Sequence, residues 1–178
     1  MRSLLWLFIP AFFANAGLAA TVDCQTEYQK HLKTDLNLSY QQFDQTENQG
    51  MRALAYAGCA KEAADLIVAY VQHNKSREIS LFWHVAQQRA SEGNNAEAIV
   101  YAKQSLVAVE DWQKKPLRWN DYVQATIAFL EKDLGKFQQH RQVVQQGKDQ
   151  HPGNAMNLQL LDKLEKNFQK SYQQATAE

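Results

Sequence analysis

The chain has 178 residues, of which 45% are hydrophobic and 21% are charged, so it can bury a core and need not be disordered. Its 19 Lys and Arg residues balance 19 Asp and Glu residues, which argues against binding to nucleic acid or to an anionic membrane surface. With only 7 Gly and 3 Pro, the chain has too few turn residues for a β-sandwich or barrel. We therefore expect a single all-α domain over residues 21–178.

Residues 1–20 have the pattern of a cleaved secretory signal peptide. Arg2 gives a positive start, residues 4–14 form an apolar run, and the small residues at 17–20 suit cleavage. The alternative is an uncleaved anchor helix, but the run is shorter than the roughly 20 apolar residues that span a bilayer, and it contains Pro10. We expect a periplasmic or secreted protein with no stable membrane insertion after cleavage.

Export changes the expectation for the two cysteines, Cys24 and Cys59. An oxidising compartment lets thiols pair, whereas the cytosol keeps them reduced. We expect one disulfide that ties the mature N-terminus to the first helix pair and stabilises the fold by about 4 kcal/mol. Two buried free thiols are the alternative. The sequence has no C-x-x-C motif and no pair of histidines at i, i+4, so we expect no metal site and no cofactor.

Apolar residues at helical spacing predict a first pair of helices after a short capped segment. Ser39 followed by Gln42 has the form of a capping box and predicts that a helix begins there. Residues 48–57 and 60–71 each carry an apolar stripe, and Gly58 interrupts the pattern between them. The two stripes predict a helical hairpin.

Two more hairpins are predicted by the same pattern. Residues 79–91 and 96–109 are predicted helices on either side of a turn at Gly93. The third hairpin consists of a helix, a turn and a return helix, at residues 117–132, Gly135 and residues 137–146.

A terminal helix is expected to cap the last hairpin. His151-Pro152-Gly153 stops the preceding helix, and Asn154 can cap a new one. The new helix carries a single apolar stripe, made of Leu158, Leu161, Leu164, Phe168 and Tyr172.

The central hairpin resembles a tetratricopeptide repeat. Gly58 and Gly93 lie 35 positions apart, close to the period of roughly 34 residues in that family. The residues that match the large apolar, small and turn positions of the motif are Phe82, Val85, Ala86, Gly93, Ala98, Ala102 and Ser105. Arg89 departs from the motif where an aromatic is usual, and Glu110 departs where Pro is usual. The resemblance implies a tetratricopeptide-like α-solenoid of about three hairpins plus a C-terminal capping helix.

Two further stretches, residues 40–45 and 119–131, look like those of small exported bacterial proteins with helical repeats. This second resemblance supports the expected compartment and implies no particular activity.

The tetratricopeptide resemblance implies a concave groove that holds a protein segment or peptide. The positions that it places in the groove, and that we take as binding residues, are Arg52, Tyr56, Trp83, His84, Gln87 and Tyr122. An aromatic ring beside Arg suits a peptide, because these residue types supply most of the binding energy at interfaces.

Three alternatives to this groove stay open. In the first, Trp83 is core and His84 satisfies a buried carbonyl. In the second, His84 belongs to a small-molecule or hydrolytic site with a carboxylate such as Asp121 or Glu131. The third is a purely structural or stress-tolerance protein with no specific ligand. The sequence contains no G-x-S-x-G, H-E-x-x-H or phosphate-loop motif, so we expect a non-catalytic protein.

Trp112 and Trp119 flank a basic connection that contains Pro116. The connection is interpreted either as a binding loop with an aromatic rim or as a long loop that each Trp anchors at one end.

Overall fold

The structure is a computed structural model, and it describes residues 22–177. The expected signal peptide, residues 1–20, lies outside the described residues. The described chain is all-α, with nine α-helices, one π-helix and no strand between residues 22 and 177. Within the same range, no helix has both the length and the apolar character needed to cross a membrane.

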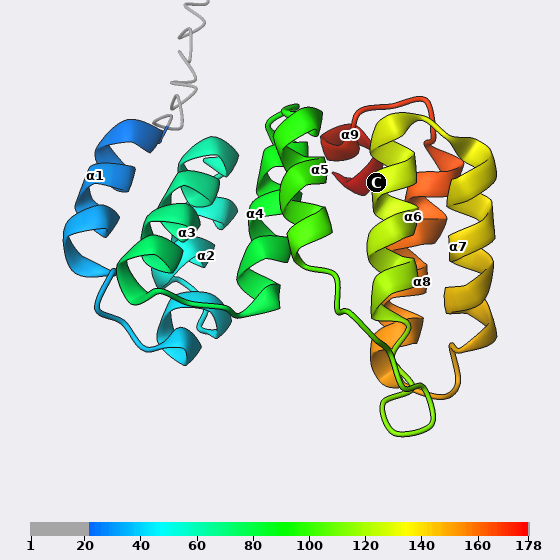
Figure 1. Cartoon of the computed structure of the whole chain (residues 1–178). Helices are drawn as coiled ribbons and strands as arrows, with labels where there is room; N and C mark the ends of the chain where they lie inside the picture. Colours follow the sequence, from blue (N-terminus) through cyan, green and yellow to red (C-terminus); the bar gives the residue numbers. More distant parts are fainter. Residues whose placement is uncertain (1–21, 178) are drawn as a thin grey trace, which may run out of the picture.

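The helices lie side by side, largely in chain order (Figure 1). The chain begins with α1 (Cys24–Thr34) and the π-helix η1 (Gln41–Gln45). The three predicted helix pairs follow as α2 (Gly50–Tyr56) with α3 (Ala60–Asn74), α4 (Ile79–Ser91) with α5 (Asn95–Gln104), and α6 (Trp119–Glu131) with α7 (Leu134–Gln146). The last elements are α8 (Pro152–Lys166) and α9 (Tyr172–Ala177). Successive pairs contact each other through α3 and α4 and through α5 and α6.

The turn between α6 and α7 lies at Lys132 and Asp133, and not at Gly135 as the sequence pattern predicted. Lys132 follows α6 in the left-handed region, with φ 60°. The Asp133 side chain then accepts the Lys136 N–H as the N-cap of α7. Because an Asp N-cap satisfies a free N–H group at a helix start, the helix begins at Leu134 and includes Gly135.

The terminal stripe that was predicted as one helix forms two. His151, and not Asn154, is the N-cap of α8, since its ring nitrogen accepts the Gly153 N–H. The helix ends at Lys166, and α9 starts after a turn at residues 167–171. Phe168 in this turn and Tyr172 of α9 both pack against the Phe129 ring of α6.

Two hydrophobic clusters meet at α4. The N-terminal cluster contains residues of η1, α2 and α3 together with Leu81 and Val85 of α4. The C-terminal cluster contains Trp83 and Ala86 of α4 together with residues of α5 to α9. The expected disulfide between Cys24 and Cys59 is confirmed, and it joins the start of α1 to the residue before α3.

Arg89, which departs from the tetratricopeptide pattern, joins three helices. Its guanidinium is buried and forms ion pairs with Asp65 of α3 at 2.5 Å, Glu92 at 2.9 Å and Glu97 of α5 at 3.0 Å. A buried cation needs such partners to offset its lost hydration. Arg89 is therefore a structural residue that holds α3, α4 and α5 together.

Candidate functional site

Trp83 and Tyr122 are buried and do not line an open groove, which corrects the expectation for these two residues. Each is 4% exposed. The Trp83 ring meets the Tyr122 and Trp119 rings edge-on, with centroids 5.0 Å and 5.6 Å apart. Burial raises the pKa of the Tyr122 hydroxyl well above 10, and a hydrogen bond with Trp83 opposes the rise only in part. The aromatic contacts hold α4 against α6.

Helix α9 covers the adjoining part of α4. Figure 1 shows it between the α4–α5 pair and α6. Tyr172 and Ala175 of α9 belong to the same core cluster as Trp83. Burial raises the pKa of Tyr172 to about 12, and a hydrogen bond with Gln87 opposes that rise. Gln87 is thus engaged by the C-terminal helix of the chain itself.

Asp44 organises the accessible part of the predicted site, although the sequence analysis did not select it. Its carboxylate lies in η1 and is completely buried. It accepts a hydrogen bond from Nδ1 of His84 at 2.6 Å and another from Nε2 of Gln45. Burial raises the pKa of Asp44, but the hydrogen bond and charge of His84, helped by Gln45, hold it below the ordinary 3.8.

The spacing of Asp44 from Tyr40 was a sequence signal that could have identified it as a buried residue. In a helix that contains Tyr40, the positions three and four residues later lie on the same face, and these are Phe43 and Asp44. A carboxylate beside a core Phe requires a buried hydrogen-bonding partner. The identity of that partner, His84, depends on a contact over 40 positions.

His84 keeps its second ring nitrogen free. Nε2 has no partner within residues 22–177, and it is not among the buried polar atoms of those residues, so water can reach it. A neutral ring that donates Nδ1–H to a carboxylate presents Nε2 as an acceptor, and a protonated ring presents it as a donor.

Arg52 and Tyr56 lie on the neighbouring helix, α2. Arg52 donates from Nε to the main-chain oxygen of Asp44, and its two terminal nitrogens have no partner in the described part of the chain. Tyr56 lies one turn further along α2 and is 62% exposed. The fold therefore brings Arg52 and His84 together around Asp44, and Tyr56 lies one turn after Arg52 at the end of α2.

The carboxylates expected for the hydrolytic alternative lie elsewhere. Asp121 pairs with His140 at 2.8 Å, and Glu131 is exposed at the end of α6. Ser80 lies one turn before His84, but its hydroxyl is hydrogen-bonded to the Tyr40 hydroxyl at 2.8 Å. Among residues 22–177, no three His, Cys, Asp or Glu side chains gather as a metal site would require.

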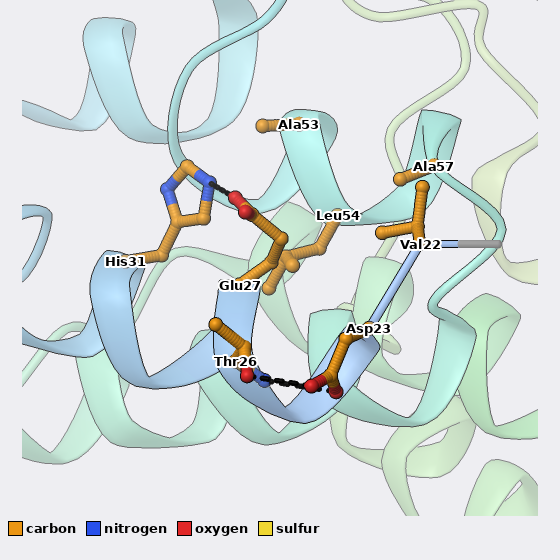
Figure 2. A pocket seen from close by; sticks show the side chains of 8 residues that line it. All are labelled: Val22, Asp23, Thr26, Glu27, His31, Ala53, Leu54 and Ala57. Atoms are coloured by element: carbon orange, nitrogen blue, oxygen red, sulfur yellow. Dashed lines mark hydrogen bonds and ion pairs between the residues drawn. The ribbon is translucent and has the colours of Figure 1, made fainter. Parts of the chain in front are cut away.

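A cavity of 380 Å³ lies between α1 and α2, and the side chains that line it are shown in Figure 2. Its polar side chains serve α1 itself. Asp23 accepts the Thr26 N–H as the N-cap, and Glu27 pairs with Lys30 at 3.1 Å and lies 4.0 Å from His31. Since these carboxylates are engaged within their own helix, the cavity has no free acidic group to orient a ligand.

A second cavity, of 420 Å³, is open to solvent and lies between the start of α4 and the connection between α5 and α6. Trp119 anchors one end of this connection by donating from Nε1 to the Ser105 carbonyl at 2.8 Å. Trp112, in contrast, is 42% exposed, and the Arg118 guanidinium lies over its ring at 3.9 Å. Of the two tryptophans, Trp119 is therefore the one that is partly buried against the C-terminal hydrophobic cluster and anchors the connection.

Comparisons with protein-family profiles, with curated proteins and with solved structures find no match to this chain. The function must therefore be argued from the site itself, because a fold alone does not specify one.

Proposed function

We propose that this protein is an exported, non-catalytic interaction module that holds a protein segment or peptide where η1, α2 and α4 meet. One observation carries the proposal. Arg52 and His84 are both fixed by the buried Asp44, and each keeps nitrogens free of protein partners. The exposed ring of Tyr56 lies one turn away on α2. Pre-positioned Arg and aromatic side chains bind well because little motion is lost when a partner docks.

A tetratricopeptide-like solenoid is the scaffold that we propose for this surface. Three successive helix pairs, each in contact with the next, support it. The disulfide between Cys24 and Cys59 supports export, because disulfides persist in oxidising compartments.

The surface favours a segment that carries acceptors. The terminal nitrogens of Arg52 are donors, and Arg pairs best with carboxylates, often through two parallel hydrogen bonds. Main-chain carbonyls of an extended peptide would serve as weaker acceptors. An acidic side chain next to an apolar one would contact both Arg52 and Tyr56.

The test is capture of the tagged protein after cross-linking in its native envelope. Tyr56→Ala is the main variant, because a side chain that is 62% exposed can be removed without opening the core. Leu134→Ala is the matched control, an apolar side chain on α7 that is 44% exposed. A partner that is retained by the wild type and the control but lost from Tyr56→Ala supports the proposal. A partner that all three proteins retain equally contradicts it.

A hydrolytic or small-molecule site around His84 is the second candidate, and the Asp44–His84 pair favours it. Carboxylates orient catalytic histidines in this way. A nucleophile must also lie within reach of Nε2, and the nearest hydroxyl along α4, that of Ser80, is bonded to Tyr40. Ester hydrolysis by the wild type that is lost in His84→Ala would favour this candidate over the interaction module.

A further inference from the structure

The 420 Å³ cavity beside the start of α4 has the dimensions of a small-molecule site, which are typically about 300–1,000 Å³. Its walls are mainly apolar. Ile79 and Trp119 come from the first positions of two helices, and Val107, Val109 and Leu117 come from the connection between α5 and α6. None of the binding residues proposed above lines the cavity, so the inference does not rest on the proposed function.

The apolar walls are accessible to solvent. Ile79 is 37% exposed and Val109 is 85% exposed. Removing such apolar surface from water lowers the free energy. Because the surface lines a cavity, it favours a ligand with an apolar body.

The charged side chains at the rim determine which charge the head group of the ligand should carry. Glu110 accepts a hydrogen bond from the first turn of α6 at 2.9 Å. Asp111 forms an ion pair with Lys114 at 3.2 Å. Lys115 is the rim residue whose side chain has no partner within the described part of the chain. The rim therefore offers one unpaired cation, while both of its carboxylates are engaged.

From these observations we infer that the cavity binds a small aliphatic carboxylate. The hydrocarbon chain lies against Ile79 and Trp119, and the carboxylate pairs with the Lys115 ammonium. An alkyl ammonium would meet Lys115 as a like charge and would find Glu110 and Asp111 already engaged. An alcohol would leave Lys115 without a counter-ion.

A matched series of head groups tests the ligand class. Octanoate, octanol and octylammonium are titrated into the oxidised protein by calorimetry, and the total tryptophan fluorescence, to which Trp119 at the cavity wall contributes, is followed in parallel. We expect octanoate to bind most tightly and to alter the fluorescence. Absence of octanoate binding, equal binding of octanoate and octanol, or tighter binding of octylammonium would each overturn the inference.

Two substitutions test the position of the ligand. Ile79→Asp places a charge in the wall, and it should still fold because an acidic residue is favourable in the first turn of a helix. We expect it to weaken octanoate binding by about tenfold or more. The control is Val100→Asp, a comparably accessible apolar residue on α5 that does not line the cavity.

Lys115→Gln tests the head group. We expect octanoate binding to weaken by about threefold, as for an exposed ion pair, with octanol binding unchanged. Lys103→Gln, on α5, is the control and should change neither. Unchanged octanoate binding in Lys115→Gln or in Ile79→Asp, with folding verified by circular dichroism, would falsify the inference.

Discussion

The first and last parts of the described chain both reach α4 with the same tetrapeptide, Ser-Tyr-Gln-Gln, at residues 39–42 and 171–174. In each copy, the Ser and the second Gln form a reciprocal capping box. The first tyrosine contacts Ser80, and the second contacts Gln87, about two turns further along α4. The first copy nevertheless begins a π-helix at a half-exposed polar surface, whereas the second begins an α-helix in an apolar core.

This comparison separates two kinds of information. The tetrapeptide determines where each helix starts, because capping acts through hydrogen bonds over three residues. The surroundings determine the helix type and the depth of burial. Around the first copy they are the buried Asp44 carboxylate and its partner His84, and around the second they are aromatic rings such as Phe129 and Phe168, whose centroids lie 5.4 Å apart.

Removal of the disulfide should cause the largest loss of stability, and it should act mainly on the N-terminal region. With Cys24 and Cys59 both changed to Ser, we expect the free energy of unfolding to fall by about 4 kcal/mol, since the bridge closes a long loop of the unfolded chain. All described tryptophans lie on the C-terminal side, at residues 83, 112 and 119. Urea unfolding followed by circular dichroism should then precede unfolding followed by fluorescence. Coincident transitions would mean that the two regions unfold as one unit.

Gly50→Ala should cause the next largest loss of stability, and it should also act on the N-terminal region. Gly50 has φ 52°, and a Cβ there would lie against the main-chain oxygen of Phe43 in η1. We expect a loss of about 3 kcal/mol, from left-handed strain together with the clash. Gly58→Ala is the matched control, with φ 80° but open space around its Cβ, and should cost about 1 kcal/mol. Equal losses in chemical denaturation would contradict the close approach of η1 and α2.

Asp44→Asn tests the contact between the buried Asp44 carboxylate and His84, and it has a defined pH dependence. The folded pKa of Asp44 lies below its ordinary 3.8, because the bond with His84 outweighs burial. Its contribution to stability is therefore complete above the ordinary pKa and is lost as pH falls through the folded pKa. We expect Asp44→Asn to lose about 2 kcal/mol at neutral pH and to show a flatter acid dependence.

Thermal unfolding of the wild type and of Asp44→Asn between neutral and acidic pH provides the measurement. The difference between the two proteins should shrink as the solution is acidified. A difference that stays constant with pH would show that Asp44 does not act as a carboxylate.

Lys132→Gln should have the smallest effect and should be confined to the C-terminal region. The Lys132 ammonium donates to the main-chain oxygens of Phe168 and Lys170, each at 2.7 Å, just before α9. We expect a loss of about 1 kcal/mol, because the ammonium is partly exposed. Amide hydrogen exchange of residues 172–177 should quicken, whereas Lys136→Gln should leave it unchanged. Faster exchange in α2 or α3 instead would contradict this localisation.

Much of the helix order could be predicted because its signals are local. The stripes at residues 48–57, 60–71 and 79–91 match α2, α3 and α4 within a few residues, and the turns at Gly58 and Gly93 are where the pattern placed them. Two helix starts were missed, although each has a local capping signal in the sequence. The Asp23 cap of α1 and the Ser171 capping box of α9 were both present in the sequence, but the stripe through Tyr172 was interpreted as continuous.

The accessibility of the candidate site could not be predicted in the same way. The positions of Arg52 and His84 on their helices follow from spacing, but their convergence on Asp44 depends on how η1, α2 and α4 pack. The position of Trp83 in the helical pattern is the same whether it faces water or the core. It is buried because residues of α6 and α9 pack against it.

By itself, the sequence determined that the described chain is helical, where most of its helices run and which two cysteines could pair. These properties depend on backbone hydrogen bonds, side-chain periodicity and composition. The tertiary structure alone decided that the buried Asp44 pairs with His84 and that α9 contacts Gln87. It also decided that a cavity lies beside Ile79. Burial and charge pairing depend on which distant segments meet, and that outcome is set by the packing of the whole chain.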